Sequence, residues 1–290
     1  IVSYARRVET EHGKNIRFTL TTNGVLLDDS SVDYINRHMR NVVLSVDGRK
    51  SVNDRMRKTI GGGGSYDTVM PKLQKLADSR GQENYYVRGT YTRENLDFAE
   101  DVKHLADMGF KQISVEPVVA ESREDYALRE EDLPELYKQY EMLAEELLKR
   151  EREGRGFNFF HFMVDLNGGP CVIKRLTGCG AGAEYLAVTP EGDLYPCHQF
   201  VGRKDFIMGN VFGGISENGV RIREAFSECN VYAKPECANC WARYYCGGGC
   251  AAAAYLRSGN IRLPYSLGCD LTRKRIECAV YINAARVLTA

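Results

Sequence analysis

The sequence predicts an α/β fold followed by a small, cysteine-rich α+β domain. In the first half, short apolar runs alternate with stretches whose apolar residues recur at helical spacing. Such β–α steps in series predict parallel strands joined by right-handed crossovers. From Cys171 on, the composition changes to glycine, cysteine and short apolar runs, which need a metal to fix them.

The strands are predicted where apolar runs stop at turn signals such as Asn-Gly and Asp-Gly. We expect strands at 16–21, 42–46, 85–91 and 113–119. Helices are expected at 2–12, from a Ser30 or Ser31 cap to 40, from a Ser65 cap to 76, and at 95–108. Leucines and tyrosines on one face indicate a further long helix from 133.

The chain is expected to comprise three regions in sequence order: 1–120, a partial barrel; 121–168, a connector with the long helix; and 169–290, the cysteine domain. The apolar strands indicate a sheet covered on both faces, as in a barrel or doubly wound fold. His161, in an aromatic-rich run of the connector, is expected to be a core histidine.

Polar groups recur where the predicted strands end. The strand ends read Thr21-Thr22-Asn23-Gly24, Ser45-Val46-Asp47-Gly48, Arg88-Gly89-Thr90 and Glu116-Pro117. Ligands in such folds bind at the carboxyl ends of the strands. Any one of these turns needs no function, but their repetition favours a ligand site at this edge.

The clearest chemical signal is a run of cysteines at metal-ligand spacing. Cys237-Ala-Asn-Cys240 is a CxxC, followed by Cys246, Cys250 and Cys269. A CxxC turn brings two thiolates within reach of one metal. Three glycines between Cys246 and Cys250 let the backbone approach a bulky inorganic core.

A metal is favoured over disulfides because the chain opens on an amphipathic segment and not on a secretory signal. Thiolate-only ligation suits zinc or iron–sulfur, and spacing alone does not choose between them. Two cubane clusters would need four protein ligands each. The available cysteines are Cys179, Cys197, Cys237, Cys240, Cys246, Cys250 and Cys269, so either Cys171 completes the set or one iron stays open. Cys229 and Cys278 fall outside this spacing, and Cys278 is expected in the core.

Charge excludes some classes of protein. Lys+Arg and Asp+Glu both number 39 in 290 residues, which argues against a general nucleic-acid or membrane-surface binder. No apolar run approaches the ~20 residues of a membrane span. Free cysteines at this density fit a reducing cytoplasm, where we expect the protein to act.

These cysteines together resemble the SPASM extension of radical SAM enzymes. The resemblance rests on Cys179, Gly192-x4-Cys197, Cys237-x2-Cys240-x5-Cys246-x3-Cys250 and Cys269. It implies two auxiliary [4Fe–4S] clusters with interleaved ligands: Cys179, Cys197 and Cys250 for the first, and Cys237, Cys240, Cys246 and Cys269 for the second. Spacing alone would have grouped Cys250 with the second set.

The first half resembles the latter two-thirds of a radical SAM (β/α)6 barrel, truncated at its amino end. By this resemblance Ser45 would bind the ribose of S-adenosylmethionine, Arg57 its carboxylate, and Val118 would lie near the adenine. Asn23 and Asp47 would lie at the same barrel mouth. The CxxxCxxC that binds the SAM-cleaving cluster is absent from these 290 residues. We therefore expect that a third cluster belongs upstream and that this chain alone does not cleave SAM.

Among SPASM enzymes, the run 195–202 and the Arg88-Gly89-Thr90 strand look most like the maturases of six-cysteine (SCIFF) peptides. These join a cysteine sulfur to an α-carbon as a thioether through radical chemistry, in a cysteine-rich precursor peptide and with an external electron donor. Alternatives are a SPASM maturase that oxidises a protein side chain, of the sulfatase- or dehydrogenase-maturating type, and a non-enzymatic iron–sulfur or zinc module. His198 stands where sulfatase-type relatives carry an aspartate, and no catalytic side chain is assigned.

Overall fold

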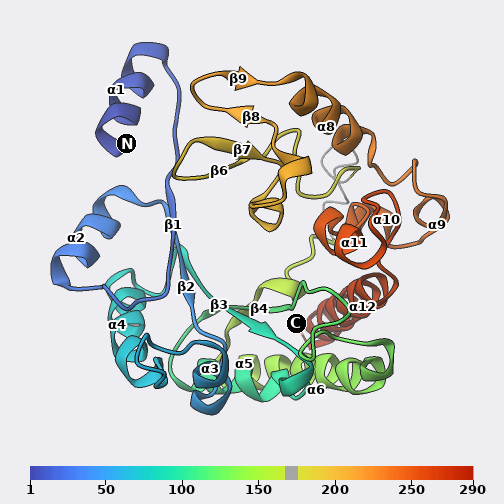
Figure 1. Ribbon diagram of the computed structural model, residues 1–290. Helices are drawn as coiled ribbons and strands as arrows, with labels where there is room; N and C mark the ends of the chain where they lie inside the picture. Colours follow the sequence, from blue (N-terminus) through green and yellow to red (C-terminus); the bar gives the residue numbers. More distant parts are fainter. Residues whose placement is uncertain (167–175, 290) are drawn as a thin grey trace. The chain divides into compact units, whose positions relative to one another are not determined.

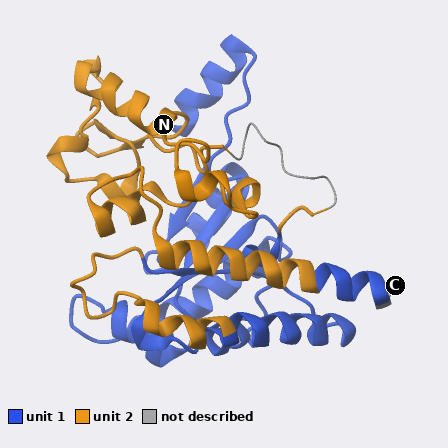
Figure 2. Ribbon diagram, turned by 90° about the vertical axis from the view of Figure 1, so that its right-hand side faces the viewer, with its two compact units in different colours: residues 1–118, 138–163, 282–290 blue, residues 119–137, 164–281 orange. Residues whose placement is uncertain are grey.

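The computed structural model describes residues 1–166 and 176–289 (Figure 1). They form two compact units, one of residues 1–118, 138–163 and 282–290 and the other of 119–137 and 164–281 (Figure 2). The chain therefore passes between the units more than once, whereas the expected regions followed one another along the sequence. No helix in the described ranges is both long and apolar enough to cross a membrane.

The first unit is built on a five-stranded parallel sheet in the order β1-β2-β3-β4-β5. Its strands are β1 (Thr19–Thr22), β2 (Asn41–Ser45), β3 (Tyr85–Tyr91), β4 (Gln112–Pro117) and β5 (Asn158–Phe159). β1 pairs with β2 along one side only, and no strand of the described residues covers its other edge. The predicted α/β alternation is confirmed in the order of these elements.

Helices join the strands, and all of them except the first lie along one side of the sheet (Figure 1). They are α1 (Val2–His12), α2 (Asp29–His38), α3 (Lys50–Met56), α4 (Tyr66–Ser79), α5 (Phe98–Asp107) and α6 (Leu133–Arg152). Their apolar faces cover Val42, Leu44, Tyr85 and Val87, all of which are fully buried. This core fixes the strand register, because a one-residue slip would turn every side chain to the other face.

The two faces of the sheet differ, which the sequence analysis did not expect. Burial in β3 alternates, with Arg88 exposed between buried Val87 and Gly89. In register, Ser45, Arg88 and Ser114 form one row across three strands. The second face therefore carries polar side chains along this row, whereas the first face is apolar.

Three local features depart from the sequence-based elements. α3 was not predicted, because it buries only Val52 and Asn53 and so shows no helical stripe. β5 lies inside the aromatic run and has only two residues. The N-cap of α2 is Asp28 and not Ser30 or Ser31, as was expected. The Asp28 carboxylate accepts from the Ser31 amide, and the Ser31 hydroxyl accepts from the Asp28 amide.

The second unit contains a four-stranded antiparallel sheet, β6-β7-β8-β9, and short helices. The strands are β6 (Ala187–Val188), β7 (Asp193–Tyr195), β8 (Gly209–Asn210) and β9 (Gly214–Ile215). The helices are α8 (Glu217–Glu228), α9 (Pro235–Ala238), α10 (Arg243–Cys246), α11 (Ala251–Ser258) and α12 (Ser266–Thr289), whose last turns belong to the first unit. The predicted hairpin is β6–β7. One cluster of buried apolar residues gathers around Tyr195, Phe200 and Phe226.

Candidate cluster and cofactor sites

The cysteines of the second unit sit at the ends of short elements. Cys197 directly precedes a 3-10 turn at His198–Phe200, and Cys250 is the N-cap of α11. Cys237 lies on α9, Cys246 ends α10, and Cys269 lies in the first turn of α12. All nine cysteines that the structure describes are free thiols. Cys171 lies outside the described residues.

One set of thiols comprises Cys179, Cys197 and Cys250. Burial raises the pKa of the Cys197 thiol, and the charges of Cys250 and Cys179 raise it further. The backbone at Gly178 lies against the carbonyl oxygens of Gly247 and Gly249, so Cys179 and Cys250 follow segments that lie side by side. The three cysteines of this set are the residues that the family resemblance assigns to the first auxiliary cluster.

The other set comprises Cys237, Cys240, Cys246 and Cys269, which line one enclosed cavity. Burial raises the pKa of Cys269 to about 11, and Cys246, Cys237 and Cys240 contribute in the same direction. Cys250 does not line this cavity. The grouping thus follows the interleaved pattern and departs from the one that spacing alone would give.

The donor set fits a cluster of several metal atoms. Among the residues that the structure describes, no three His, Cys, Asp or Glu side chains gather closely enough to hold a single metal ion. A cubane makes a different demand, because each thiolate binds its own iron. The four-cysteine cavity has no carboxylate or imidazole among its other lining residues except Glu236, so its chemistry is that of soft thiolate ligation.

Backbone at the CxxxC segment is left-handed at three successive positions. Gly247, Gly248 and Gly249 have φ of 69°, 86° and 76°. A residue with a Cβ would be strained there, so only glycine lets the chain turn back between Cys246 and Cys250. Their expected role in a close approach to an inorganic core stays a prediction.

Three cations beside the four-cysteine cavity, Lys234, Arg243 and Arg273, were missed by the sequence analysis. Lys234 is buried and donates a hydrogen bond to the Gly248 carbonyl oxygen at 2.8 Å. Its charge acts to lower the pKa of Cys237, whereas burial raises that pKa by more. Arg273 lines the cavity and hydrogen-bonds to Cys240. Lys234 and Arg273 both offset thiolate charge, and the spacing of Arg273, one turn after Cys269 on a helix, could have indicated it.

The strand-end site lies in the first unit. The Asp47 carboxylate is buried and accepts two hydrogen bonds from Arg57, Nε to Oδ2 at 2.7 Å and Nη2 to Oδ1 at 2.8 Å. Asp47 Oδ1 also accepts from the Thr90 amide at 3.0 Å. This bidentate pair ties the end of β2 to the end of α3 and to β3, and it engages the guanidinium that the resemblance assigns to the SAM carboxylate.

The other expected cofactor residues lie at the ends of neighbouring strands. Asn23 is exposed, and its side-chain oxygen accepts from the Val25 amide at 3.1 Å, which makes a turn. Ser45 is the last residue of β2, half-buried on the polar face. Val118 directly follows β4, with its amide bonded to the Tyr91 carbonyl at 2.9 Å. The structure brings Asp47 and Arg57 into contact. Asn23 and Ser45 directly follow the paired residues Thr22 and Leu44, so they lie at the same edge of the sheet.

A polar network on the open face was not assigned from the sequence. Glu116 on β4 lies at its centre: Ser114 Oγ donates to Oε1 at 3.0 Å, and His161 Nε2 lies 3.2 Å from Oε2. Arg88 Nε lies 3.8 Å from Oε1. His161 is buried, as expected for a core histidine, yet it also takes part in this network. The alternation of polar residues along 86–90 and 112–116 is the signal that would have found it.

Comparison with known proteins finds similarity in both halves of the chain. The SPASM family, an iron–sulfur cluster-binding domain, matches residues 179–241. The mycofactocin maturase MftC of Mycolicibacterium smegmatis is 29% identical over 265 residues, which cover 88% of this chain and 62% of that protein. This chain is thus similar to radical SAM enzymes that carry a SPASM domain. MftC of Mycobacterium tuberculosis H37Rv is 28% identical over 269 residues, with the same coverage.

Solved structures of other proteins share the fold. The structure of anSMEcpe with bound AdoMet superposes with a TM-score of 0.74 at 20% identity, covering 99% of this chain and 80% of that one. Streptococcus suis SuiB bound to S-adenosylmethionine gives a TM-score of 0.53 at 17% identity, with coverages of 87% and 60%. The partial radical SAM barrel and small SPASM region expected from the sequence are confirmed. The chain spans less than two-thirds of the length of the MftC relatives.

Proposed function

We propose that this chain is the substrate-binding and electron-relay part of a radical SAM peptide maturase that forms a cysteine sulfur-to-α-carbon thioether. The observation that carries the proposal is the separation of seven thiols into a set of three and a set of four lining one cavity. A three-thiolate set leaves one iron of a cubane open, where a substrate thiolate could bind.

A bound auxiliary cluster would supply an electron acceptor and, at an open iron, a site for sulfur. The chain's own residues hold the thiolates and exclude water from the four-cysteine cavity, and Lys234 and Arg273 offset its negative charge. On the polar face of the sheet, Ser45, Arg88 and Glu116 present hydrogen-bonding groups to a ligand. Asp47 and Arg57 fix the strand end beside them.

Thioether formation would join the sulfur of a peptide cysteine to an α-carbon and remove two hydrogens from the peptide. SAM, cleaved with one electron from the donor, would take up the α-hydrogen as 5′-deoxyadenosine; the thiol proton would be released, and the remaining electron would pass to an auxiliary cluster. The precursor peptide is proposed to be cysteine-rich, and a protein electron donor is the expected partner. Relatives named as maturases support a peptide substrate, and one anSMEcpe structure holds a Cp18Cys peptide.

The test is co-expression of the full-length protein with candidate cysteine-rich peptides, followed by mass spectrometry of the peptide. A loss of two hydrogens, with fragmentation that places the new bond between sulfur and an α-carbon, is the expected result. Conversion of a side chain to an aldehyde would instead support a side-chain-oxidising maturase. Zinc without acid-labile sulfide in the anaerobically purified protein would overturn the cluster assignment itself.

A further inference from the structure

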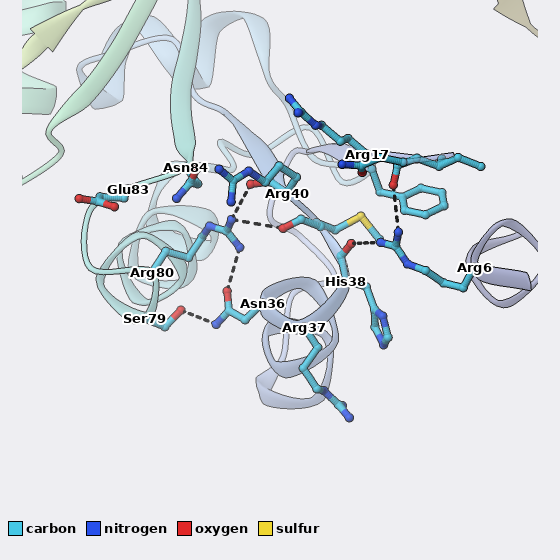
Figure 3. Close-up of a pocket in the computed structure, with 14 residues that line it drawn as sticks. Arg6, Arg17, Asn36, Arg37, His38, Arg40, Ser79, Arg80, Glu83 and Asn84 are labelled. Carbon is cyan, nitrogen blue, oxygen red and sulfur yellow. Dashed lines mark hydrogen bonds between the residues drawn. The ribbon is translucent and has the colours of Figure 1, made fainter. Parts of the chain in front are cut away.

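The first unit contains a cavity at the end of the sheet opposite the strand-end site. It has a volume of about 700 Å³ and is formed where β1, β2 and β3 begin (Figure 3). Its lining residues come from α1, from the ends of α2 and α4 and from the segments that enter the three strands. No residue assigned to a cluster or to SAM lines it.

This cavity is strongly basic although the whole chain has no net charge. Its lining includes the five arginines Arg6, Arg17, Arg37, Arg40 and Arg80, against one acidic residue, Glu83. A local excess of this size raises the concentration of anions at the cavity and attracts them from solution. Some of these arginines hydrogen-bond to other residues of the fold, and others do not.

Two of the arginines have a clear structural task. Arg6 donates to the carbonyl oxygen of Ile16 at 2.9 Å and also pairs with Glu9 at 2.6 Å. Arg80 donates to the Met39 and Arg40 carbonyls at 3.3 and 3.1 Å, just beyond the end of α2, and to Asn36. They satisfy carbonyls that the helix end leaves open.

Arg17 and Arg40 have no such task. Their side chains are exposed, and neither guanidinium makes a hydrogen bond or ion pair with the residues that the structure describes. Arg40 is also close enough to Arg80 to disturb it: burial lowers the pKa of Arg80, and the charge of Arg40 lowers it further. All acceptors of Arg80 are neutral, so two neighbouring guanidinium groups lack a counter-ion.

We propose that this cavity binds a phosphate group, held between Arg40 and Arg80 with Arg17 at the rim. Planar guanidinium forks match the oxygens of a phosphate in two-pronged geometry, and a doubly charged anion offsets both cations at once. The cavity is larger than one phosphate needs, so the ligand class is a small di- or triphosphate, either inorganic or carried by a nucleotide.

The test is isothermal titration of the anaerobically purified protein with inorganic pyrophosphate and, separately, with ATP, at low ionic strength. Saturable binding is expected, weakened by added salt. Arg40→Ala should weaken it about tenfold or more, and Arg40→Lys, which keeps the charge but loses the fork, by an intermediate factor. Tighter binding of ATP than of pyrophosphate would identify a nucleotide as the source, and equal binding would identify the phosphates alone.

The matched control is Arg221→Ala, an exposed arginine of α8 that does not line the cavity. Circular dichroism and thermal unfolding establish that each variant is folded. Arg80 is not substituted, because it caps carbonyls. Binding that Arg40→Ala leaves unchanged, or that Arg221→Ala weakens equally, would overturn the proposal, and so would the absence of saturable binding. None of these outcomes bears on thioether formation.

Discussion

Asp47, through its pair with Arg57, ties the fold together at the proposed cofactor site. Its carboxylate is 4% exposed, whereas the Arg57 side chain is 31% exposed. Removing the carboxylate leaves a partly buried guanidinium and the Thr90 amide without their acceptor. Losing one partner of a buried pair is costly, and partial exposure reduces that cost.

Asp47→Asn should therefore lower the free energy of unfolding by about 2 kcal/mol, between the values for exposed and fully buried pairs. Urea denaturation followed by circular dichroism measures it. Asp67→Asn is the control, because Asp67 pairs with Lys50 at the surface and should change stability far less. Equal effects of the two substitutions would show that the Asp47 pair is not a structural tie.

His104 provides a pH-dependent part of the stability. Its Nε2 lies 2.6 Å from Tyr66 Oη, and burial lowers its pKa below the unfolded value of 6.5. As the pH falls through 6.5, the unfolded chain binds a proton that the folded chain does not. The free energy of unfolding should then decrease with falling pH, until the folded histidine is protonated as well.

His104→Gln should flatten this decrease when unfolding is measured between about pH 7.5 and 5. His12→Gln, at an exposed position in the last turn of α1, serves as the control and should leave the slope intact. A slope unchanged in His104→Gln would place the titrating group elsewhere.

At the scale of elements, α12 contributes residues both to the four-cysteine cavity and to the core. Cys269 and Arg273 are four residues apart and both line the four-cysteine cavity, while Cys278 is buried further along the same helix. Residues four apart lie on one face of a helix. The helix thus carries a proposed cluster ligand, a neighbouring cation and a packing residue in one rigid body.

Arg273→Gln should lower the reduction potential of the cluster at this cavity, because a nearby positive charge stabilises the reduced, more negative form. A redox titration followed by electron paramagnetic resonance would measure the change. Lys274→Gln is the control, since Lys274 lies over the Tyr137 ring and does not line the cavity. A similar shift in both variants would indicate a general charge effect and no local one.

At the scale of the whole molecule, the two sets of thiols predict two separable clusters. Cys250→Ser should alter the same spectroscopic signal as Cys197→Ser, and Cys237→Ser should alter the other. Cys278→Ser, a buried cysteine outside both sets, should leave the iron content unchanged. If Cys250→Ser and Cys237→Ser changed one common signal, the interleaved grouping would be wrong.

Most of the fold could be read from the sequence, because β1 to β4 and their helices carry strong periodic signals. α3 and β5 could not, since each buries too few residues to leave a pattern. The cysteines were identifiable by spacing and resemblance. Lys234, Arg273 and the Glu116 network were not, because their roles depend on which residues the fold brings beside them.

The one-sided pairing of β1 has a practical consequence for handling the isolated chain. Its unpaired amide and carbonyl groups offer a template to a strand of another molecule, a common route to aggregation. A lysine in place of exposed Thr21 places a charge on that strand and should discourage such addition, as seen by light scattering at high concentration. Preparations of this chain should therefore gain colloidal stability from a single charged residue on the strand, with no change in the core.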